Sequence, residues 1–151
     1  MEIGLGVALA LFGTVIAAGL SGAGSAVAIG MAGQAAAAVV AEDPKKFGQT
    51  LVLQAVGTTN GIYGLLIGFL ILNRAMDVQS WHEGLILLAS GIPIGLVGYA
   101  AAIAQGKTLV TGIILIGKKS GELAKALIYA AMVETFAVFA LLISFLMLNS
   151  I

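Results

Sequence analysis

Four long apolar segments, separated by short polar ones, make up almost the whole of this 151-residue chain. The apolar segments cover about residues 3–41, 47–73, 84–117 and 126–151, and Lys107 is the only charge within the third. Each is at least as long as the roughly 20 apolar residues that a helix needs to cross a bilayer. The pattern therefore predicts an all-α membrane protein with four transmembrane helices.

The composition agrees with a membrane protein surrounded by lipid. Hydrophobic residues make up 60% of the chain and charged residues 9%, and the mean hydropathy is +1.12. A soluble domain carries about 25% charged residues. The net charge is zero, so no basic surface for nucleic acid is expected, and the chain has no Cys for disulfides, thiolate metal sites or iron–sulfur clusters.

The basic residues of the polar segments predict the orientation. Lys45 and Lys46 lie in the first polar segment and Lys118 and Lys119 in the third, whereas the middle segment has only Arg74. Cytoplasmic loops of membrane proteins are enriched in Lys and Arg. We therefore expect a multi-pass protein of the cell membrane with both hairpin turns in the cytoplasm and both termini outside.

The second half of the chain repeats the first at an offset of 76 residues. The segment Leu65-Leu66-Ile67 recurs as Leu141-Leu142-Ile143. The small residues Gly19, Gly22, Ala28 and Gly30 recur as Gly95, Gly98, Ala104 and Gly106. An offset that spans two helices preserves their direction, which indicates a parallel duplication. The chain is thus predicted to consist of two tandem helical hairpins, residues 1–75 and 76–151.

Small residues recur at every fourth position of the first helix: Gly6, Ala10, Thr14, Ala18, Gly22, Ala26 and Gly30. This spacing allows membrane helices to approach closely. Packing within a monomeric bundle would explain one such stripe. Because the first helix has small residues on several faces, we expect it to lie in an inner layer of an oligomer.

Glu134 is the only charged residue in the last apolar segment, and it lies near the middle. A carboxylate at bilayer depth costs at least roughly 2.5–3.5 kcal/mol. Such a group is either a neutral structural carboxyl that hydrogen-bonds between helices or a site that binds a proton or a cation. Its isolation favours the binding site, and the first hairpin has Thr58 at the equivalent position.

Few other polar groups are expected at membrane depth. Val56, Thr59, Asn60 and Tyr63 have the i, i+3, i+4, i+7 spacing of one helical face, and Gln105 lies in the third helix. Taken singly, each polar side chain can be explained by an interhelical hydrogen bond worth about 0.6 kcal/mol. Together with Glu134 they predict an oxygen cage, which a hard cation needs and a proton does not.

Three segments resemble the membrane rotor proteolipid of V-type ATPases, called the K subunit in sodium-pumping bacterial enzymes. They are Gly57-Thr58-Thr59-Asn60-Gly61-Ile62-Tyr63-Gly64, Ala104-Gln105-Gly106-Lys107 and Met132-Val133-Glu134-Thr135. The resemblance covers essentially the whole chain, including the duplicated hairpin. It implies a homo-oligomeric ring with odd-numbered helices inside and an ion site between helices two, three and four.

By this resemblance Glu134 is the ion-binding carboxylate, Gln105 an amide ligand, and Tyr63 the phenol that hydrogen-bonds the carboxylate. Thr59 is a hydroxyl ligand and Val56 a backbone-carbonyl ligand. Asn60 stands where sodium-type members carry Gln, and Gly57-Thr58 replaces a Pro-Gly pair. The expected metal ligands are thus Glu134, Gln105, Thr59, Asn60 and Val56, with Na⁺ as the ion and no organic cofactor.

The resemblance implies a non-catalytic subunit that carries Na⁺ across the membrane at Glu134 while ATP hydrolysis elsewhere turns the ring. The expected partners are identical copies, a stator subunit that supplies an arginine, and central-stalk subunits at the cytoplasmic turns. Alternatives are a proton-carrying ring, a small secondary cation or drug antiporter, and a purely structural four-helix membrane protein. The last leaves Glu134 without a purpose, and the scarcity of aromatic residues (7%) disfavours an antiporter.

Overall fold

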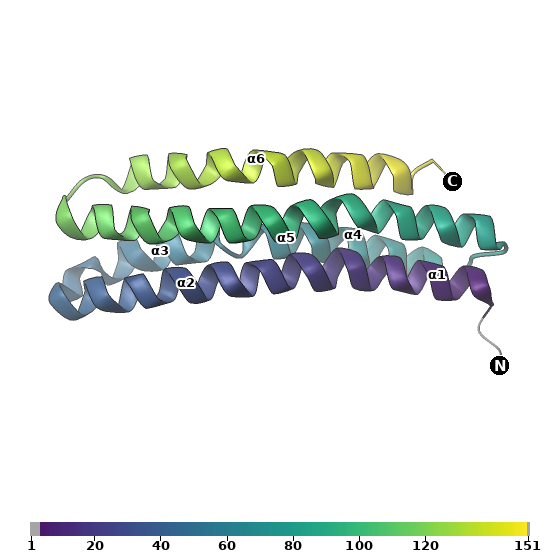
Figure 1. Ribbon diagram of the computed structural model, residues 1–151, viewed down its shortest axis with the longest axis horizontal. Coiled ribbons are helices and arrows are strands. Elements are labelled where there is room, and N and C mark those ends of the chain that lie inside the picture. Colours follow the sequence, from purple (N-terminus) through teal and green to yellow (C-terminus); the bar gives the residue numbers. More distant parts are fainter. Residues whose placement is uncertain (1–3, 151) are drawn as a thin grey trace.

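The computed structural model describes residues 4–150, which form an elongated bundle of four long helices (Figure 1). The first helix comprises α1 (Leu5–Thr14), a π-helical turn (Val15–Leu20) and α2 (Ser21–Glu42). A 3₁₀ turn (Pro44–Lys46) leads into the second helix, formed by α3 (Phe47–Val56) and α4 (Thr59–Ala75). The third is α5 (Trp81–Lys118) and the fourth is α6 (Leu123–Leu148).

The four predicted spans are confirmed by the lengths of these helices. They contain 38, 32, 38 and 26 residues, and each includes an 18-residue stretch with a mean hydropathy between 1.6 and 2.3. All four are long and apolar enough to cross a membrane. The protein is therefore a multi-pass, all-α membrane protein.

The two hairpin turns lie at one end of the bundle, and the connection between the hairpins lies at the other end with the described ends of the chain (Figure 1). At the turn end, Lys46 Nζ donates a hydrogen bond to Ser120 Oγ at 3.0 Å, which links the two turns. At the opposite end, Arg74 donates to the Leu148 carbonyl oxygen and to Asn149 Oδ1. That the turns are cytoplasmic stays a prediction from the charges.

The third helix, α5, packs against each of the other three long helices, so it forms the centre of the bundle. Its contact with α1 is close because Gly13 has no side chain: a Cβ there would lie 2.7 Å from the Leu87 carbonyl oxygen. Buried Leu and Ile side chains fill the remaining space, among them Ile67, Ile94 and Leu109. Close approach through small residues is how membrane helices gain packing energy without a hydrophobic driving force between them.

Side chains of other helices form hydrogen bonds with the α5 backbone beside Pro93. Proline lacks an N–H group and disturbs the hydrogen bonds of the preceding turn. The neighbouring Ile94 N–H donates to Ser144 Oγ at 3.1 Å, and the Ile94 carbonyl accepts from Ser21 Oγ at 2.9 Å. Both serines are fully buried. Backbone N–H and carbonyl groups in a bilayer must find hydrogen-bond partners within the protein. These two hydroxyls bond to the Ile94 N–H and carbonyl without interrupting the helix.

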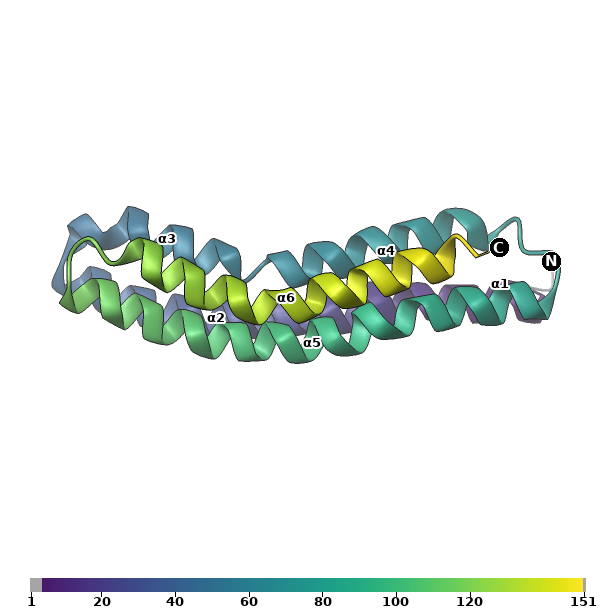
Figure 2. The same cartoon turned by 90° about the horizontal axis from the view of Figure 1, so that it is seen from above.

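The second helix is interrupted at Gly57 and Thr58, which separate α3 from α4 (Figure 2). The backbone tightens there, because the N–H groups of Gly57 and Thr58 donate to carbonyls three residues earlier. In a continuous helix Gly61 N–H would bond to the Gly57 carbonyl; here it donates to Ser25 Oγ at 2.8 Å. A hydroxyl from the first helix thus takes over a backbone bond at the break.

We expect Ser25→Ala to lower the free energy of unfolding by about 1–3 kcal/mol, because the Gly61 N–H would lose its partner in an apolar environment. Loss of helical circular dichroism on heating the detergent-solubilised protein measures this. Thr111→Ala is the matched control, since that exposed hydroxyl bonds only within its own helix. Equal stability of the two variants would mean that Ser25 does not support the break.

Candidate ion-binding site

Glu134 lies in the middle of α6, and its side chain points between α4 and α5. It is half-buried, whereas its neighbours Met132 and Phe136 are 66% and 68% exposed on the outer face of the helix. The carboxylate therefore lies at the edge of the bundle, close to the surface that lipid or another protein would cover.

Two side chains donate hydrogen bonds to the carboxylate of Glu134. Tyr63 Oη of α4 donates to Oε1 at 2.5 Å, and Gln105 Nε2 of α5 donates to Oε2 at 3.2 Å. Residues 71 and 29 positions away in the chain thus meet at one carboxylate. Hydrogen bonds to a charged acceptor are stronger than neutral ones, so both donors hold the carboxylate in place between α4 and α5.

Asn60 contacts Gln105, not Glu134. Its Nδ2 donates to Gln105 Oε1 at 2.9 Å, and both side chains are fully buried. Within residues 4–150, Asn60 Oδ1 is a buried oxygen without a hydrogen-bond partner. Buried polar atoms nearly always have partners, so an orphaned oxygen on a side chain that bonds to Gln105 is the kind of group that a cation or a water would satisfy.

Thr59 and Val56 lie on the two sides of the break in the second helix. Val56 is the last residue of α3 and Thr59 the first of α4, so the expectation of one continuous helical face is wrong. Thr59 Oγ1 donates to the Val56 carbonyl at 3.0 Å, which keeps the two oxygens adjacent. Breaking the helix frees backbone groups near the site, as happens at ion sites in other broken membrane helices.

The structure thus brings some predicted residues to Glu134 and leaves others one step away. Tyr63 and Gln105 contact the carboxylate directly, Asn60 contacts Gln105, and Thr59 contacts Val56. The described residues contain no cluster of three or more His, Cys, Asp or Glu side chains. The group therefore combines one carboxylate with neutral oxygens, a donor set that suits a monovalent hard cation or a proton.

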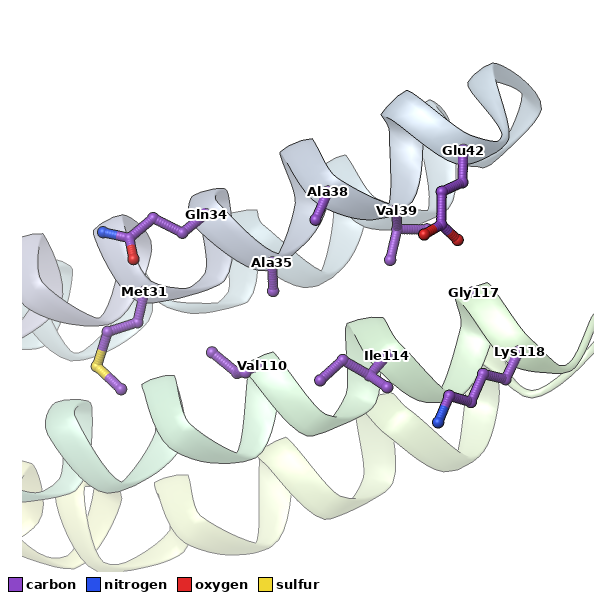
Figure 3. A pocket seen from close by; sticks show the side chains of 10 residues that line it. All are labelled: Met31, Gln34, Ala35, Ala38, Val39, Glu42, Val110, Ile114, Gly117 and Lys118. Atoms are coloured by element: carbon purple, nitrogen blue, oxygen red, sulfur yellow. The ribbon is translucent and has the colours of Figure 1, made fainter.

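A larger groove lies elsewhere, at the turn end between α2 and α5 (Figure 3). Its volume is about 570 Å³, and its wall is mainly apolar, with Met31, Ala35 and Ile114 among the lining side chains. Glu42 and Lys118 lie on opposite sides of its end. Its lining includes none of the residues around Glu134, so the polar site and this groove are separate.

Comparison with known families matches the chain twice. The family model that describes the C subunit of ATP synthase matches residues 12–71 and again residues 88–147. The chain belongs to this family. The two matches begin at residues 12 and 88, an offset of 76, which confirms the tandem duplication of the hairpin. The linker between the matches contains the predicted boundary at residues 75/76, whose position stays a prediction.

Two curated proteins are similar to this ATP synthase C family member over almost its whole length. It is 42% identical to the V-type sodium ATPase subunit K of Enterococcus hirae, over 94% of this chain and 91% of that protein. It is 37% identical to the A-type ATP synthase subunit K of Methanocaldococcus jannaschii, over 93% of this chain and 61% of that protein. The resemblance to V-type rotor proteolipids is therefore confirmed.

Sequence reasoning did not identify Ser25 as part of the site's support. Its hydroxyl accepts a hydrogen bond from the Gly61 N–H beside the break, one residue from Asn60. In the sequence it is one of many small residues in the first helix, and only its hydroxyl at membrane depth distinguishes it from the alanines. The break itself had a signal, because Gly57 and Gly61 are poor helix formers on either side of Thr58 and Thr59.

Proposed function

We propose that this chain is the rotor-ring subunit of a V-type ATPase and that Glu134 carries one Na⁺ across the membrane in each passage. The observation that carries the proposal is the half-buried carboxylate of Glu134 with Tyr63 and Gln105 as donors, in a chain 42% identical to a V-type sodium ATPase subunit K. Identical copies form the ring. The subunit is non-catalytic, and ATP is hydrolysed in another part of the complex.

The need to neutralise Glu134 couples ion binding to rotation. An ionised carboxylate facing lipid costs several kcal/mol, so a copy moves through the bilayer only when its site is loaded. At the stator, an arginine supplied by a different protein competes for the carboxylate and releases the ion. The hydrogen bonds from Tyr63 and Gln105 stabilise the ionised carboxylate at the moment when the site is empty.

The amide pair of Asn60 and Gln105 supports two states of the site. In the described arrangement Gln105 presents its N–H₂ group to Glu134 and its oxygen to Asn60. Rotating both amides by half a turn keeps their mutual hydrogen bond, gives up the bonds from Gln105 Nε2 to Glu134 and to the Ala130 carbonyl, and turns Gln105 Oε1 toward the carboxylate. The first state suits a site in which Glu134 is ionised and no ion is bound. In the second state the Gln105 oxygen is a ligand for Na⁺, together with oxygens of Thr59 and Val56.

The same arrangement defines the alternative, a proton-carrying ring. A protonated Glu134 needs no oxygen cage, and one amide N–H₂ facing it is sufficient. Sodium is favoured because a proton would not require the additional oxygens of Asn60, which is buried, and of Thr59 and Val56, which are half-buried. In either case the stalk subunits bind at the turns that carry Lys45 and Lys119, which we assign to the cytoplasm.

We expect a hydrophobic carbodiimide to modify Glu134, because these reagents attack protonated carboxyls in apolar surroundings. Sodium at about ten times its dissociation constant should slow the reaction about tenfold, since the unoccupied fraction falls accordingly. The protection should weaken as the pH is lowered, because protons compete for the same oxygens. Mass spectrometry of the modified peptide measures the rate in the assembled complex.

Choline chloride at equal ionic strength controls for salt, and Glu134→Gln controls for modification elsewhere. A labelling rate that depends on pH but not on sodium would favour the proton ring. Absence of modification at Glu134 at any pH would contradict its role as the ion carrier.

A further inference from the structure

Three glycines of the first helix lack close packing within the chain. At Gly22 and Gly30 no atom lies within 4 Å of the position that a Cβ would take. At Gly19 the nearest atom is a methyl carbon of Val15, at 3.9 Å. Gly19 and Gly30 are exposed on the surface of the bundle. Nothing inside the chain therefore explains why these positions lack side chains.

Their counterparts 76 residues later are buried at the contact between the two hairpins. A Cβ on any of them would lie 2.6–2.7 Å from an atom of the first helix. The contacts are Gly95 with the Ile16 carbonyl oxygen, Gly98 with Ser21 Oγ, and Gly106 with Ala28 Cα. In the second hairpin, then, glycine at each position is required by a neighbouring helix.

The residues of the first helix that lie closest to these glycines also have counterparts 76 residues later. Ile16 corresponds to Ile92, Ser21 to Val97 and Ala28 to Ala104, so two residues are identical, whereas Val97 is larger than Ser21 and apolar. Ile92 is 39% exposed, and Ala104 is exposed. The second hairpin thus presents on its free side two of the three side chains that the first hairpin uses to contact it.

That free side is also hollowed. A groove of about 480 Å³ runs between α5 and α6, with Val97 and Ala104 among its lining residues and Val133 and Phe136 on its other wall. Its lining is almost entirely apolar. A helix with small residues fits such a groove, because small residues allow close backbone approach.

We propose that the contact between the two hairpins of one chain is repeated between chains. The α5 face with Ile92, Val97 and Ala104 packs on the face with Gly19, Gly22 and Gly30 of the next copy. A contact between two different surfaces of identical copies continues from copy to copy and closes into a ring when the rotation allows it. The inference rests on the proposed ring and specifies the register of its helices.

Disulfide cross-linking tests the register, because the chain has no cysteine of its own. Within the chain, Ala28 Cβ lies 3.0 Å from the Cβ position of Gly106. A slight separation of the helices gives the roughly 3.5–4.5 Å of a disulfide. We expect Gly30→Cys with Ala104→Cys to form a ladder of oligomers on oxidation of the assembled complex, seen on a non-reducing gel.

The matched control is Gly30→Cys with Ala100→Cys, which shifts one partner by one turn, about 6 Å along the helix. This pair and each single variant should give no ladder beyond dimers. Full-size complexes with a ladder only from the shifted pair, or from neither pair, would overturn the register while leaving the proposed function intact. A solubilised protein of monomer or dimer size would overturn the ring itself.

A second variant does not depend on oxidation. Gly30→Leu has room within the chain, so the protein should keep its helical content but assemble at least about tenfold less well into rings, as measured by native sizing. Gly48→Leu is the control: Gly48 also has open space, and its counterpart Ala124 stays exposed beside the first hairpin. Full-size rings formed equally well by Gly30→Leu would contradict the proposed contact.

Discussion

Replacing Glu134 by Gln is expected to abolish ATP-driven ion transport and to leave the ring assembled. The amide is close to the carboxyl in shape and carries no charge, so Tyr63 and Gln105 keep a neighbour of the same size. It has no charge with which to exchange a cation or a proton. Sodium uptake into vesicles containing the reconstituted complex, together with native sizing of the ring, measures both effects.

Glu122→Gln is the control for removing an acid from the same helix region. Its carboxylate pairs with Lys125 at 2.6 Å near the start of α6, away from the proposed site. Transport in this variant should match that of the unaltered complex. If Glu134→Gln vesicles pumped at a substantial fraction of the normal rate, Glu134 could not be the carrier.

Replacing Gln105 by Leu is expected to raise the half-saturating sodium concentration of the ATPase by at least about tenfold, which corresponds to about 1.4 kcal/mol. In the sodium-loaded state that we propose, the Gln105 oxygen is a ligand, and Leu has no oxygen to replace it. The change also removes the partner of the buried Asn60 Nδ2. Sodium titration of ATP hydrolysis in the assembled complex gives the value.

Tyr63→Phe separates the loss of a ligand from the loss of a hydrogen bond. It removes the other donor to Glu134 but no proposed ligand, so it should raise the half-saturating sodium concentration by less than Gln105→Leu does. Carbodiimide modification of Glu134 at low pH should survive in both variants. A half-saturating sodium concentration unchanged by Gln105→Leu, or no sodium dependence in the unaltered complex, would refute the sodium cage.

The membrane architecture could be predicted from local patterns. The four apolar segments became four helices of spanning length, and the 76-residue repeat matches the spacing of the two family matches. Such features depend on the hydrophobicity of each segment and on the bilayer thickness, and neither requires knowledge of distant contacts. The isolation of Glu134 is likewise visible in the sequence, because charges at membrane depth are rare and costly.

The arrangement around Glu134 was predicted less completely. Tyr63 and Gln105 donate to the carboxylate, whereas Asn60 bonds to Gln105, and Thr59 bonds to Val56 across a break in the helix; that these residues bind an ion stays a prediction. Spacing along one helix indicates which side chains share a face, provided that the helix is continuous. It does not indicate how far the helix is rotated or where its hydrogen bonding fails.

The sequence by itself thus determined the number of spans, the duplication and the position of the one intramembrane acid. Only the tertiary structure decided that Ser25 supports the break, that Asn60 and Gln105 form a buried amide pair, and that Gly106 is packed while Gly30 is open. The physical reason is that the hydrophobic pattern of a segment determines whether that segment forms a membrane-spanning helix. Hydrogen bonds and close glycine contacts depend on the rotation and separation of helices that are distant in the chain.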